Sequence, residues 1–362
     1  MKLAIFGAKS IALGVCLALR RLYPEHKVET FLVSSLKGNP SVLAGIPVQE
    51  VQSFRNKGMH VLVATPEDMH SDIIDFLEMQ GFYHYICIDS HKESILMEKY
   101  FEKSNIFPSV HKLTVGNEKA KLQIYQAKFY KDKRLNNSYI LPDWIVPIQA
   151  GTALTSIQVA EVTDCVGDNI SKKNETYCEL TVLYWLWKNR LLERCAAKNE
   201  RISESSSAEY YGLFHYRRLL DIQNDDLYRM KKNGVDVILP YPLPHEPNIY
   251  EHHTRYVSEQ EWKILIEVLE DLEPEYARAF PKILQQPYLY NYNMIIAKRD
   301  ILRGYCEWLF PILKRTEELS TPKGWERADR YIGYLGENLL TLYFMFHADE
   351  WKIKHVGRKM LI

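Results

Sequence analysis

The sequence lacks the marks of a disulfide-bonded, zinc-binding or membrane-spanning protein. Its six cysteines stand at positions 16, 87, 165, 178, 195 and 306, with no C-x-x-C pair among them. This scatter argues against a zinc site and a disulfide framework, and it favours a reducing compartment. No run of about 18 apolar residues occurs, so we expect no transmembrane helix. Residues 1–7 run directly into a strand and a glycine turn, without the apolar segment and cleavage site of a signal peptide. The protein is therefore expected in the cytoplasm.

An excess of either charge is also missing. Lysine plus arginine and aspartate plus glutamate both number 46, so the formal net charge is zero. A protein that coats nucleic acid needs a basic surplus, so this balance predicts no nucleic-acid partner, although it is compatible with a local basic cleft. Aromatic residues are plentiful instead, with 24 tyrosines and 7 tryptophans. Most of them are expected in the core, where large faces need filling, and a few in contact with flat or sugar-like ligands.

The first hundred residues alternate between strand and helix patterns. Strands are expected at residues 2–6, 28–34, 60–64 and 85–89, and helices at residues 14–22, 69–80 and 90–103. This alternation implies parallel strands joined by right-handed crossovers. A polar segment with Pro108 and Gly116 then marks a domain break. We predict a small Rossmann-like doubly wound domain at residues 1–115 and a second α/β domain at residues 116–362.

A glycine turn between Gly7 and Gly14 follows the first strand. It resembles a dinucleotide-binding turn, but Lys9 or Ser10 stands where the middle glycine is needed for close approach of a pyrophosphate. The second strand ends at Val33 to Ser35 without the acidic residue that holds a ribose hydroxyl. We therefore expect no NAD, and a structural or regulatory role for the first domain.

One stretch of the second domain places two arginines at the end of a strand. The apolar run Tyr210–Phe214 is followed by His215, Tyr216, Arg217 and Arg218. Strand alternation puts the first and third of these four on one face and the others on the opposite face. Neighbouring guanidiniums are costly to bury without an anion, and their forks match phosphate oxygens. A solvated strand end with a core histidine fits the local pattern equally well.

Two glutamates are predicted beside apolar helix surface. Glu179 lies on a helix that Ser171 or Asn174 is expected to cap, and Glu337 lies two turns after Arg330 on a helix near the C-terminus. A carboxylate in such surroundings is either paired with a cation or functional.

Several separated segments resemble one bacterial family, in the same order along the chain. They are Ile145–Gly151, Gly167–Ser171, Asn174 with Tyr177–Thr181, Tyr184–Asn189, Gly212–Arg218, Asn293 with Met294, Tyr305–Leu309, and Gly333 with Glu337. This ordered set is similar to the domain-of-unknown-function family 4422 (DUF4422) over about residues 121–346. Members of that family occur in capsule and exopolysaccharide gene clusters and are regarded as glycosyltransferases. The first domain lies outside the resemblance and is an addition.

The resemblance implies a glycosyltransferase-A-like (GT-A-like) α/β fold and a hexosyltransferase activity in capsular or exopolysaccharide biosynthesis. It implies a nucleotide-sugar donor, UDP-linked, and a saccharide acceptor on a lipid carrier. Galactose, as pyranose or furanose, is one candidate for the transferred sugar.

The sequence departs from this fold's usual D-x-D motif, which holds Mn²⁺ or Mg²⁺ against the diphosphate at a strand end. Here the comparable strand end carries His215 to Arg218, and the nearest carboxylate is Asp221. Metal dependence is therefore undecided, with His215 and Asp221 as the candidate ligands. Because cationic side chains can neutralise a leaving diphosphate as a divalent ion does, we assign His215, Tyr216, Arg217 and Arg218 to the donor diphosphate.

Glycosyl transfer with inversion also needs a base for the acceptor hydroxyl, and a carboxylate is the usual choice. The candidates are Asp168, Glu179 and Glu337, which the sequence does not rank. Residues assigned to sugar and nucleotide hydroxyls are Asn169, Ser171, Asn291, Asn293 and Arg330, the two later asparagines at the head of a strand expected at 287–297.

Two other functions stay open. One is an NAD(P)-linked sugar-nucleotide oxidoreductase that uses the first domain, against which the degenerate glycine turn argues. The other is a non-catalytic sensor of sugar nucleotides in a polysaccharide assembly complex. The basic and apolar tail at residues 352–362 would let the protein adsorb peripherally at the inner face of the membrane, and a solvated terminus is the alternative.

Overall fold

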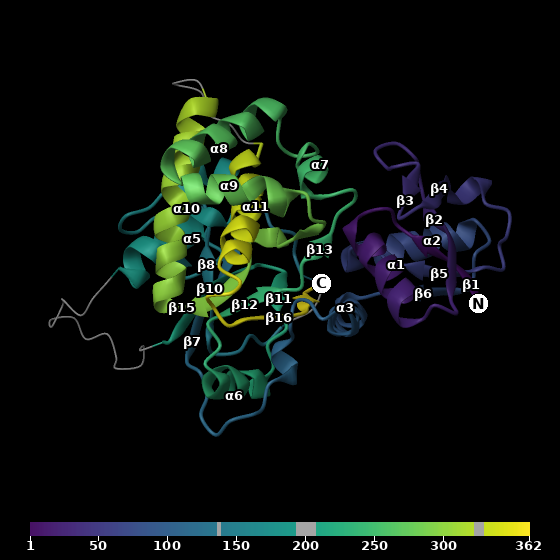
Figure 1. Cartoon of the computed structure of the whole chain (residues 1–362), viewed down its shortest axis with the longest axis horizontal. Coiled ribbons are helices and arrows are strands. Elements are labelled where there is room, and N and C mark those ends of the chain that lie inside the picture. Colours follow the sequence, from purple (N-terminus) through teal and green to yellow (C-terminus); the bar gives the residue numbers. More distant parts are fainter. Residues whose placement is uncertain (136–138, 193–207, 322–328) are drawn as a thin grey trace.

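The computed structural model describes residues 1–135, 139–192, 208–321 and 329–362. Within these ranges the chain forms two lobes, each with helices packed on a β-sheet (Figure 1). The N-terminal lobe comprises β1–β6 and α1–α3, from Lys2 to Ser104, and the C-terminal lobe comprises β7–β17 and α4–α11, from Leu122 to Met360. This confirms the expected α/β class, while the exact domain boundary at residue 115 stays a prediction.

The N-terminal lobe is built on a six-stranded sheet with the order β3-β4-β2-β1-β5-β6. Its elements are β1 (Lys2–Phe6), α1 (Ser10–Leu22), β2 (Lys27–Val33), β3 (Val42–Leu43), β4 (Ile46–Glu50), β5 (His60–Val63), α2 (His70–Met79), β6 (Tyr85–Cys87) and α3 (Ser90–Ser104). All neighbours in the order from β4 to β6 are parallel, and β3 and β4 form an antiparallel hairpin. The alternation of strands and helices thus produces the Rossmann-like arrangement that the sequence predicts.

The C-terminal lobe is built on a seven-stranded mixed sheet with the order β16-β12-β15-β10-β7-β8-β9. Its strands are β7 (Leu122–Lys128), β8 (Ile145–Gln149), β9 (Val162–Thr163), β10 (Tyr210–His215), β12 (Val237–Pro240), β15 (Ile295–Lys298) and β16 (Ile353–Val356). Smaller pairs join β11 (Arg218–Leu220) to β17 (Arg358–Met360) and β13 (Leu243–Pro244) to β14 (Tyr288–Leu289). The helices are α4 (Asn174–Tyr177), α5 (Leu180–Leu186), α6 (Asn224–Asn233), α7 (Ile249–His253), α8 (Glu259–Leu272), α9 (Pro274–Leu284), α10 (Arg299–Ser320) and α11 (Tyr331–Phe346).

Strand β10 separates the two hydrophobic layers of this lobe. Tyr211 and Leu213 pack into the core formed with α5 and α8–α11, whereas Tyr210 and Phe214 pack into the core formed with α6. Figure 1 shows α6 on the opposite side of the sheet from α8 to α11. Because side chains alternate along a strand, one apolar run buries both faces of the sheet and leaves its polar end, His215, at the edge.

The C-terminal tail is part of the sheet framework. Strand β16 pairs with β12, β17 pairs with β11, and Val356 and Leu361 are buried. The expectation of a solvated terminus is therefore wrong. In the described part of the chain, no helix combines the length and apolar character needed to cross a membrane.

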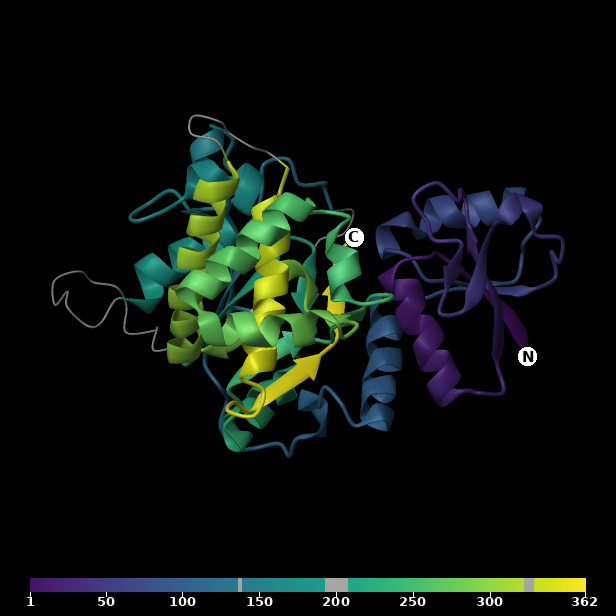
Figure 2. The same ribbon diagram turned by 45° about the horizontal axis from the view of Figure 1, so that its top comes forward.

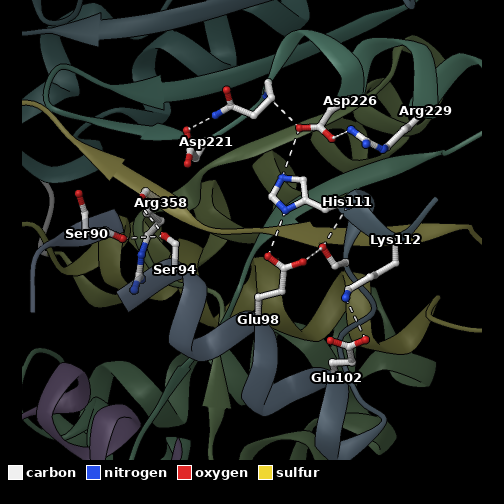
Figure 3. Close-up of polar contacts among 12 residues, drawn as sticks. Ser90, Ser94, Glu98, Glu102, His111, Lys112, Asp221, Asp226, Arg229 and Arg358 are labelled. Carbon is white, nitrogen blue, oxygen red and sulfur yellow. Dashed lines mark hydrogen bonds and ion pairs between the residues drawn. The ribbon is translucent and has the colours of Figure 1, made fainter. Parts of the chain in front are cut away.

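Helix α3 lies between the lobes and is tied to both (Figure 2). Figure 3 shows His111 between two carboxylates, with Nδ1 3.1 Å from Glu98 of α3 and Nε2 3.4 Å from Asp226 of α6. Hydrogen bonds with Asp226 and Glu98 raise the pKa of His111 to about 10, so the ring is a cation at neutral pH. On the same helix, Glu93 pairs with Arg358 of β17 at 2.6 Å. These ion pairs fix the N-terminal lobe against the C-terminal lobe.

Gly212 of β10 lies where β15 passes too closely for any side chain. A Cβ at this position would come 2.0 Å from the carbonyl oxygen of Ile295. Because this backbone atom cannot yield as a flexible side chain does, we expect Gly212→Ala to lower the free energy of unfolding by about 3 kcal/mol in urea titrations. Gly58→Ala is the matched control, since its nearest neighbour is 3.8 Å away, and it should change stability by less than about 0.5 kcal/mol. Equal stability of the two variants would contradict this close approach of β15 to Gly212.

Candidate functional site

A cavity of about 600 Å³ opens at the carboxyl ends of three parallel strands. Strand β7 pairs in parallel with both β8 and β10, so the ends of all three meet at one edge of the sheet. Their last residues or the next ones, Lys128, Ala150 and His215, line the cavity. Ligands of α/β proteins bind at such edges, and the volume is within the usual range for a small molecule.

Most of the predicted site residues gather in or behind this cavity. Those that line it are Glu179, His215, Tyr216, Arg217, Arg218, Arg330 and Glu337. Asn291 and Asn293 lie behind the two glutamates. Asn291 donates to Glu337 at 3.0 Å, and Asn293 donates to Glu179 at 2.8 Å. The asparagines therefore orient carboxylates rather than present their amides to the cavity.

The other four predicted residues neither line the cavity nor bond to its two glutamates. Asp168 is exposed and accepts a hydrogen bond from the Tyr184 hydroxyl at 3.2 Å. Asn169 donates to carbonyls of its own loop, and Ser171 is buried and donates to Asp164 at 2.5 Å. The Asp221 carboxylate accepts from Gln223 at 2.7 Å. These contacts give the four side chains roles in holding loops.

Glu179 and His215 form a largely buried ion pair in the cavity wall. His215 Nε2 lies 3.5 Å from Glu179 Oε1 and 2.5 Å from the carbonyl oxygen of Tyr292, with 12% of the glutamate and 17% of the histidine side chain exposed. Burial disfavours both charges, but the attraction between them outweighs it. As a result the pKa of Glu179 is lowered and the pKa of His215 is raised. Both pKa shifts favour the ionised form of the pair.

The helix that contains Glu179 in the sequence prediction is interrupted at Cys178, and Glu179 lines the cavity just after this interruption. The sequence predicts one capped helix here, but the structure has α4 ending at Tyr177 and α5 beginning at Leu180. Cys178 between them has φ of 52° and ψ of −133°, and neither Ser171 nor Asn174 caps a helix. A positive φ costs energy at a non-glycine residue, so it persists only where the surrounding structure enforces it. Such residues cluster at functional sites.

A second irregular segment replaces the strand expected at residues 287–297. Strand β14 ends at Leu289, and β15 begins only at Ile295. Between them Tyr292 has φ of 74° and Asn293 has φ of 49°. This turn directs the Tyr292 carbonyl toward His215 and the Asn293 amide toward Glu179. Strain at this turn is therefore offset by hydrogen bonds to the buried ion pair.

Glu337 is the second carboxylate of the cavity, and its proton affinity differs from that of Glu179. Burial first, and the negative charge of Glu179 second, raise the pKa of Glu337 to about 7. One cavity therefore holds one carboxylate that stays ionised and one that exchanges a proton near neutral pH. This is the protonation behaviour of a general base or acid.

The two arginines have different partners. Tyr216 and Arg217 lie between β10 and β11, so the alternation of side chains between the two faces of the sheet ends at His215. Arg217 and Arg218 therefore both line the cavity instead of lying on opposite faces of a strand. Arg217 Nη1 lies 2.6 Å from Asp68 of the N-terminal lobe. The Arg218 guanidinium lies 4.5 Å from the centre of the Tyr292 ring, and no described residue forms an ion pair with it. Of these two adjacent guanidiniums, one is thus neutralised by a carboxylate and the other has no ion pair with a described acid.

A chain of hydrogen bonds connects the glycine turn of the N-terminal lobe to Glu337. Ser10 Oγ lies 2.9 Å from His245 Nδ1, His245 Nε2 lies 3.3 Å from Asn291 Oδ1, and Asn291 donates to Glu337. Burial lowers the pKa of His245 to about 4, so the ring is neutral at pH 7. With its proton assigned to Nε2 from these partners, the ring accepts from Ser10 and donates to Asn291. Every donor then points toward the carboxylate.

Sequence reasoning did not single out Asp132, which lines the cavity, or Asp68, which contacts one of the cavity's arginines. Asp132 follows β7 in a loop recognised only as basic, and burial raises its pKa to about 6. Asp68 lies far from the cavity in sequence and reaches Arg217 only because the lobes are in contact. The position of Asp132 just after a strand end is the one signal that would have marked it.

Metal ligation finds little support in the described residues. They contain no group of three or more His, Cys, Asp and Glu side chains arranged to hold an ion. His215 is engaged by Glu179 and Tyr292, and Asp221 does not line the cavity and accepts a hydrogen bond from Gln223. These residues do not fit a protein-held divalent cation, so no step proposed below runs through one.

The sequence model of one family, described as "Domain of unknown function (DUF4422)", matches residues 130–348, which is more than half of the chain. The chain belongs to the DUF4422 family. Among solved structures, the chain is similar to one described as the apo structure of the bifunctional glycosyltransferase WbbM, with 26% identity and a TM-score of 0.54. No curated protein matches it.

The structural match covers 67% of this chain and 45% of the WbbM chain. The chain therefore spans less than half the length of its structural relative. At this level of similarity the match supports the glycosyltransferase-like α/β fold that the DUF4422 resemblance implies.

The raised pKa of Glu337 predicts a pH-dependent stability. Its folded-state pKa of about 7 exceeds the ordinary value of 4.5, so the folded protein binds a proton that the unfolded chain has lost. Stability therefore falls as the pH rises from about 4.5 to 7. Glu337→Gln removes this loss, and we expect its free energy of unfolding to exceed that of the wild type by on the order of 3 kcal/mol at pH 8 but little at pH 5.

Urea unfolding at the two pH values measures this difference. Glu270→Gln, at an exposed position of α8, is the control and should show no pH-dependent gain. A constant difference between Glu337→Gln and wild type at both pH values would contradict the shifted pKa.

Proposed function

We propose that the chain is a glycosyltransferase that moves a hexosyl group from a UDP-linked sugar to a saccharide acceptor. One observation carries this proposal. A single cavity at the strand ends combines two glutamates of opposite pKa shift with an adjacent pair of arginines. The first pair is suited to proton transfer from a hydroxyl, and the second to a departing diphosphate.

The donor diphosphate is assigned to Arg217 and Arg218. Lys128, Lys131 and Lys133 line the same cavity and add positive charge near them. A guanidinium group binds two phosphate oxygens at once, and it is more weakly hydrated than the ammonium group of a lysine. When the glycosidic bond to the diphosphate breaks, these cations stabilise the negative charge that develops on the leaving UDP.

Glu337 is assigned as the base. In its ionised form it accepts the proton of the acceptor hydroxyl, while the hydroxyl oxygen bonds to the anomeric carbon of the sugar. The bond from that carbon to the diphosphate breaks, and its electron pair leaves with UDP. A pKa of about 7 suits this role, because the group is ionised in a large share of molecules and still holds the proton it takes.

Glu179 is assigned a positioning role. Its pKa is lowered and its oxygen is engaged by His215 and Asn293, so it is a weaker proton acceptor than Glu337. It holds His215 as a cation whose ring lies beside the arginines, where the charge favours a phosphate. Arg330, at the start of α11, lines the same cavity and is assigned to sugar or nucleotide hydroxyls.

The wider setting follows from the family. We propose a lipid-linked capsular or exopolysaccharide acceptor, reached from the cytoplasm at the membrane surface, with galactose as one candidate for the transferred hexose. A thermal-shift panel of UDP-, GDP- and dTDP-sugars, with and without EDTA, tests donor choice and metal dependence together, because a ligand that binds the native state raises the melting temperature. Stabilisation by UDP-sugars without turnover would favour a sensor, and stabilisation by NAD(P) an oxidoreductase.

Replacement of the base should abolish turnover without preventing donor binding. We expect Glu337→Gln to lower kcat for transfer from a UDP-hexose by about a hundredfold to ten-thousandfold, because the amide cannot accept the acceptor proton. The Kd for UDP should change less than about twofold, since the arginines are untouched. Steady-state kinetics and UDP titration measure the two quantities.

Glu175→Gln is the matched control, because Glu175 lines the same cavity with an exposed side chain and no assigned role. It should retain wild-type turnover. Full activity of Glu337→Gln together with loss of activity in Glu179→Gln would transfer the role of base to Glu179.

Asp68 should compete with the donor for Arg217. The two side chains are 2.6 Å apart and each is 18% exposed, so a phosphate must displace the carboxylate to bind this guanidinium. We expect Asp68→Asn to bind UDP about fivefold more tightly, because the competing charge is removed. Asp72→Asn removes a charge from an exposed position on nearby α2 and should leave the Kd unchanged. Weaker binding in Asp68→Asn would show that Asp68 assists the donor instead of opposing it.

A further inference from the structure

A second, smaller cavity lies where the two lobes meet. The N-terminal lobe contributes the carboxyl end of its sheet, with Thr65 after β5, Ser90 at the start of α3 and Ile11 in the first turn of α1. The C-terminal lobe contributes Arg218 and Arg358. The cavity therefore has walls from both lobes and exists only when they are in contact.

This position is the topological switch point of the N-terminal sheet. From β1 the chain passes to β2 on one side, and the later strand β5 lies on the other side of β1. Open α/β sheets bind ligands at the carboxyl ends of the strands beside such a reversal. The two turns there are in contact, since a Cβ on Gly7 would lie 2.8 Å from the Ala64 carbonyl oxygen and 3.2 Å from Thr65 Cγ2.

The size of the cavity excludes a dinucleotide. Its volume is about 40 Å³, compared with at least about 300 Å³ for a typical small-molecule site. Such a space holds about three water molecules or one group of similar size. A single phosphoryl group has that size, whereas a nucleotide or sugar ring does not.

Two residues that line this cavity each have a buried donor without a hydrogen-bond partner among the described residues. One is the hydroxyl of Thr65, and the other is Nη1 of Arg358, whose Nη2 pairs with Glu93 at 2.6 Å. An unpaired buried donor is costly, and native proteins rarely leave one without a function or a bound group. A tetrahedral oxyanion accepts hydrogen bonds from both.

The charge around the cavity also favours an anion. Arg218, Arg358 and Lys359 line it on one side, and Glu67 and Glu93 are its acids. Both acids have partners, because Glu67 accepts from the backbone N–H of Ser90 at 2.9 Å and Glu93 pairs with Arg358. Arg218 is left without an acidic partner, and α1, a helix of 13 residues, starts at the cavity with its positive dipole end.

We propose that this interlobe cavity binds one phosphoryl group of a sugar substrate. Arg218 and Tyr292 line both this cavity and the 600 Å³ cavity, so a ligand can occupy both with its phosphoryl group between the lobes. The proposal rests on the proposed transferase function for the identity of the remainder of the ligand. The proposal gives the N-terminal lobe a direct role in substrate binding. This role replaces dinucleotide binding, for which the glycine turn of the lobe is unsuited.

Thr65→Val tests the site without removing a charge. The variant keeps the shape of the side chain and loses only a hydroxyl that has no protein partner, so its melting temperature should equal or exceed that of the wild type. Its affinity for inorganic phosphate should fall about tenfold, the loss expected for one hydrogen bond to a charged group. Phosphorus NMR titration of wild type and variant measures this, with Thr163→Val on edge strand β9 as the control.

A second variant removes the guanidinium while keeping the charges balanced. The double variant Glu93→Gln/Arg358→Met deletes both partners of the ion pair, so no buried charge is left alone. It should also bind phosphate at least about tenfold more weakly than the wild type. Unchanged phosphate affinity in both this variant and Thr65→Val would overturn the proposal.

The source of the phosphoryl group is decided by two further probes, UDP and a hexose 1-phosphate. Equal weakening of UDP binding in Thr65→Val assigns the cavity to the donor diphosphate. Weakened binding of hexose 1-phosphate with unchanged UDP binding assigns it to a phosphate on the acceptor. Phosphate binding that depends on Thr65 in a protein that transfers from no nucleotide sugar would remove the transferase function while leaving the phosphoryl site in place.

Discussion

The buried ion pair of Glu179 and His215 is the interaction on which the cavity depends. A carboxylate that is only 12% exposed needs a cation, and His215 supplies it from the end of β10. The pair is held by segments in unfavourable backbone conformations, with φ of 52° at Cys178, 74° at Tyr292 and 49° at Asn293. Each such residue costs on the order of 1–3 kcal/mol, which the hydrogen bonds from Asn293 and to the Tyr292 carbonyl offset. Removal of either charge would leave both strain and an unpaired ion.

The N-terminal lobe takes part in the same charge arrangement. Its Asp68 neutralises Arg217, and its Ser10 begins the hydrogen-bond chain that ends on Glu337. The chain passes through His245, which is neutral and donates in one direction only. The lobe that lies outside the family resemblance therefore contacts Arg217 directly, and it is connected to Glu337 through the hydrogen bonds of His245 and Asn291. The Rossmann-like lobe thus positions Asp68 and Ser10 next to residues of the C-terminal lobe's site.

Local sequence patterns predicted the features that depend on residues adjacent in the sequence. The alternation of strand and helix patterns predicted the α/β class. The polar end of β10 was predicted correctly. Both faces of this strand are buried, so the strand ends where the run of apolar residues ends. Tertiary features were not predictable in the same way. Asp168 is exposed in its polar loop but does not line the cavity, and the positive φ of Cys178 arises from packing that no local pattern records. Asp68 meets Arg217 only through the contact between the lobes.

The proton and phosphate sites of the proposed reaction are coupled by charge. Glu179 already raises the pKa of Glu337, and a bound diphosphate on Arg217 and Arg218 adds negative charge to the same cavity. A donor therefore raises the proton affinity of Glu337 further, which makes it a stronger base when the sugar to be transferred is present. In the proposed reaction, departure of UDP would remove this negative charge and lower the pKa of Glu337, so that the proton taken from the acceptor would be released to solvent. The buried cation at His215 limits this cycle to one carboxylate, because it keeps Glu179 ionised throughout.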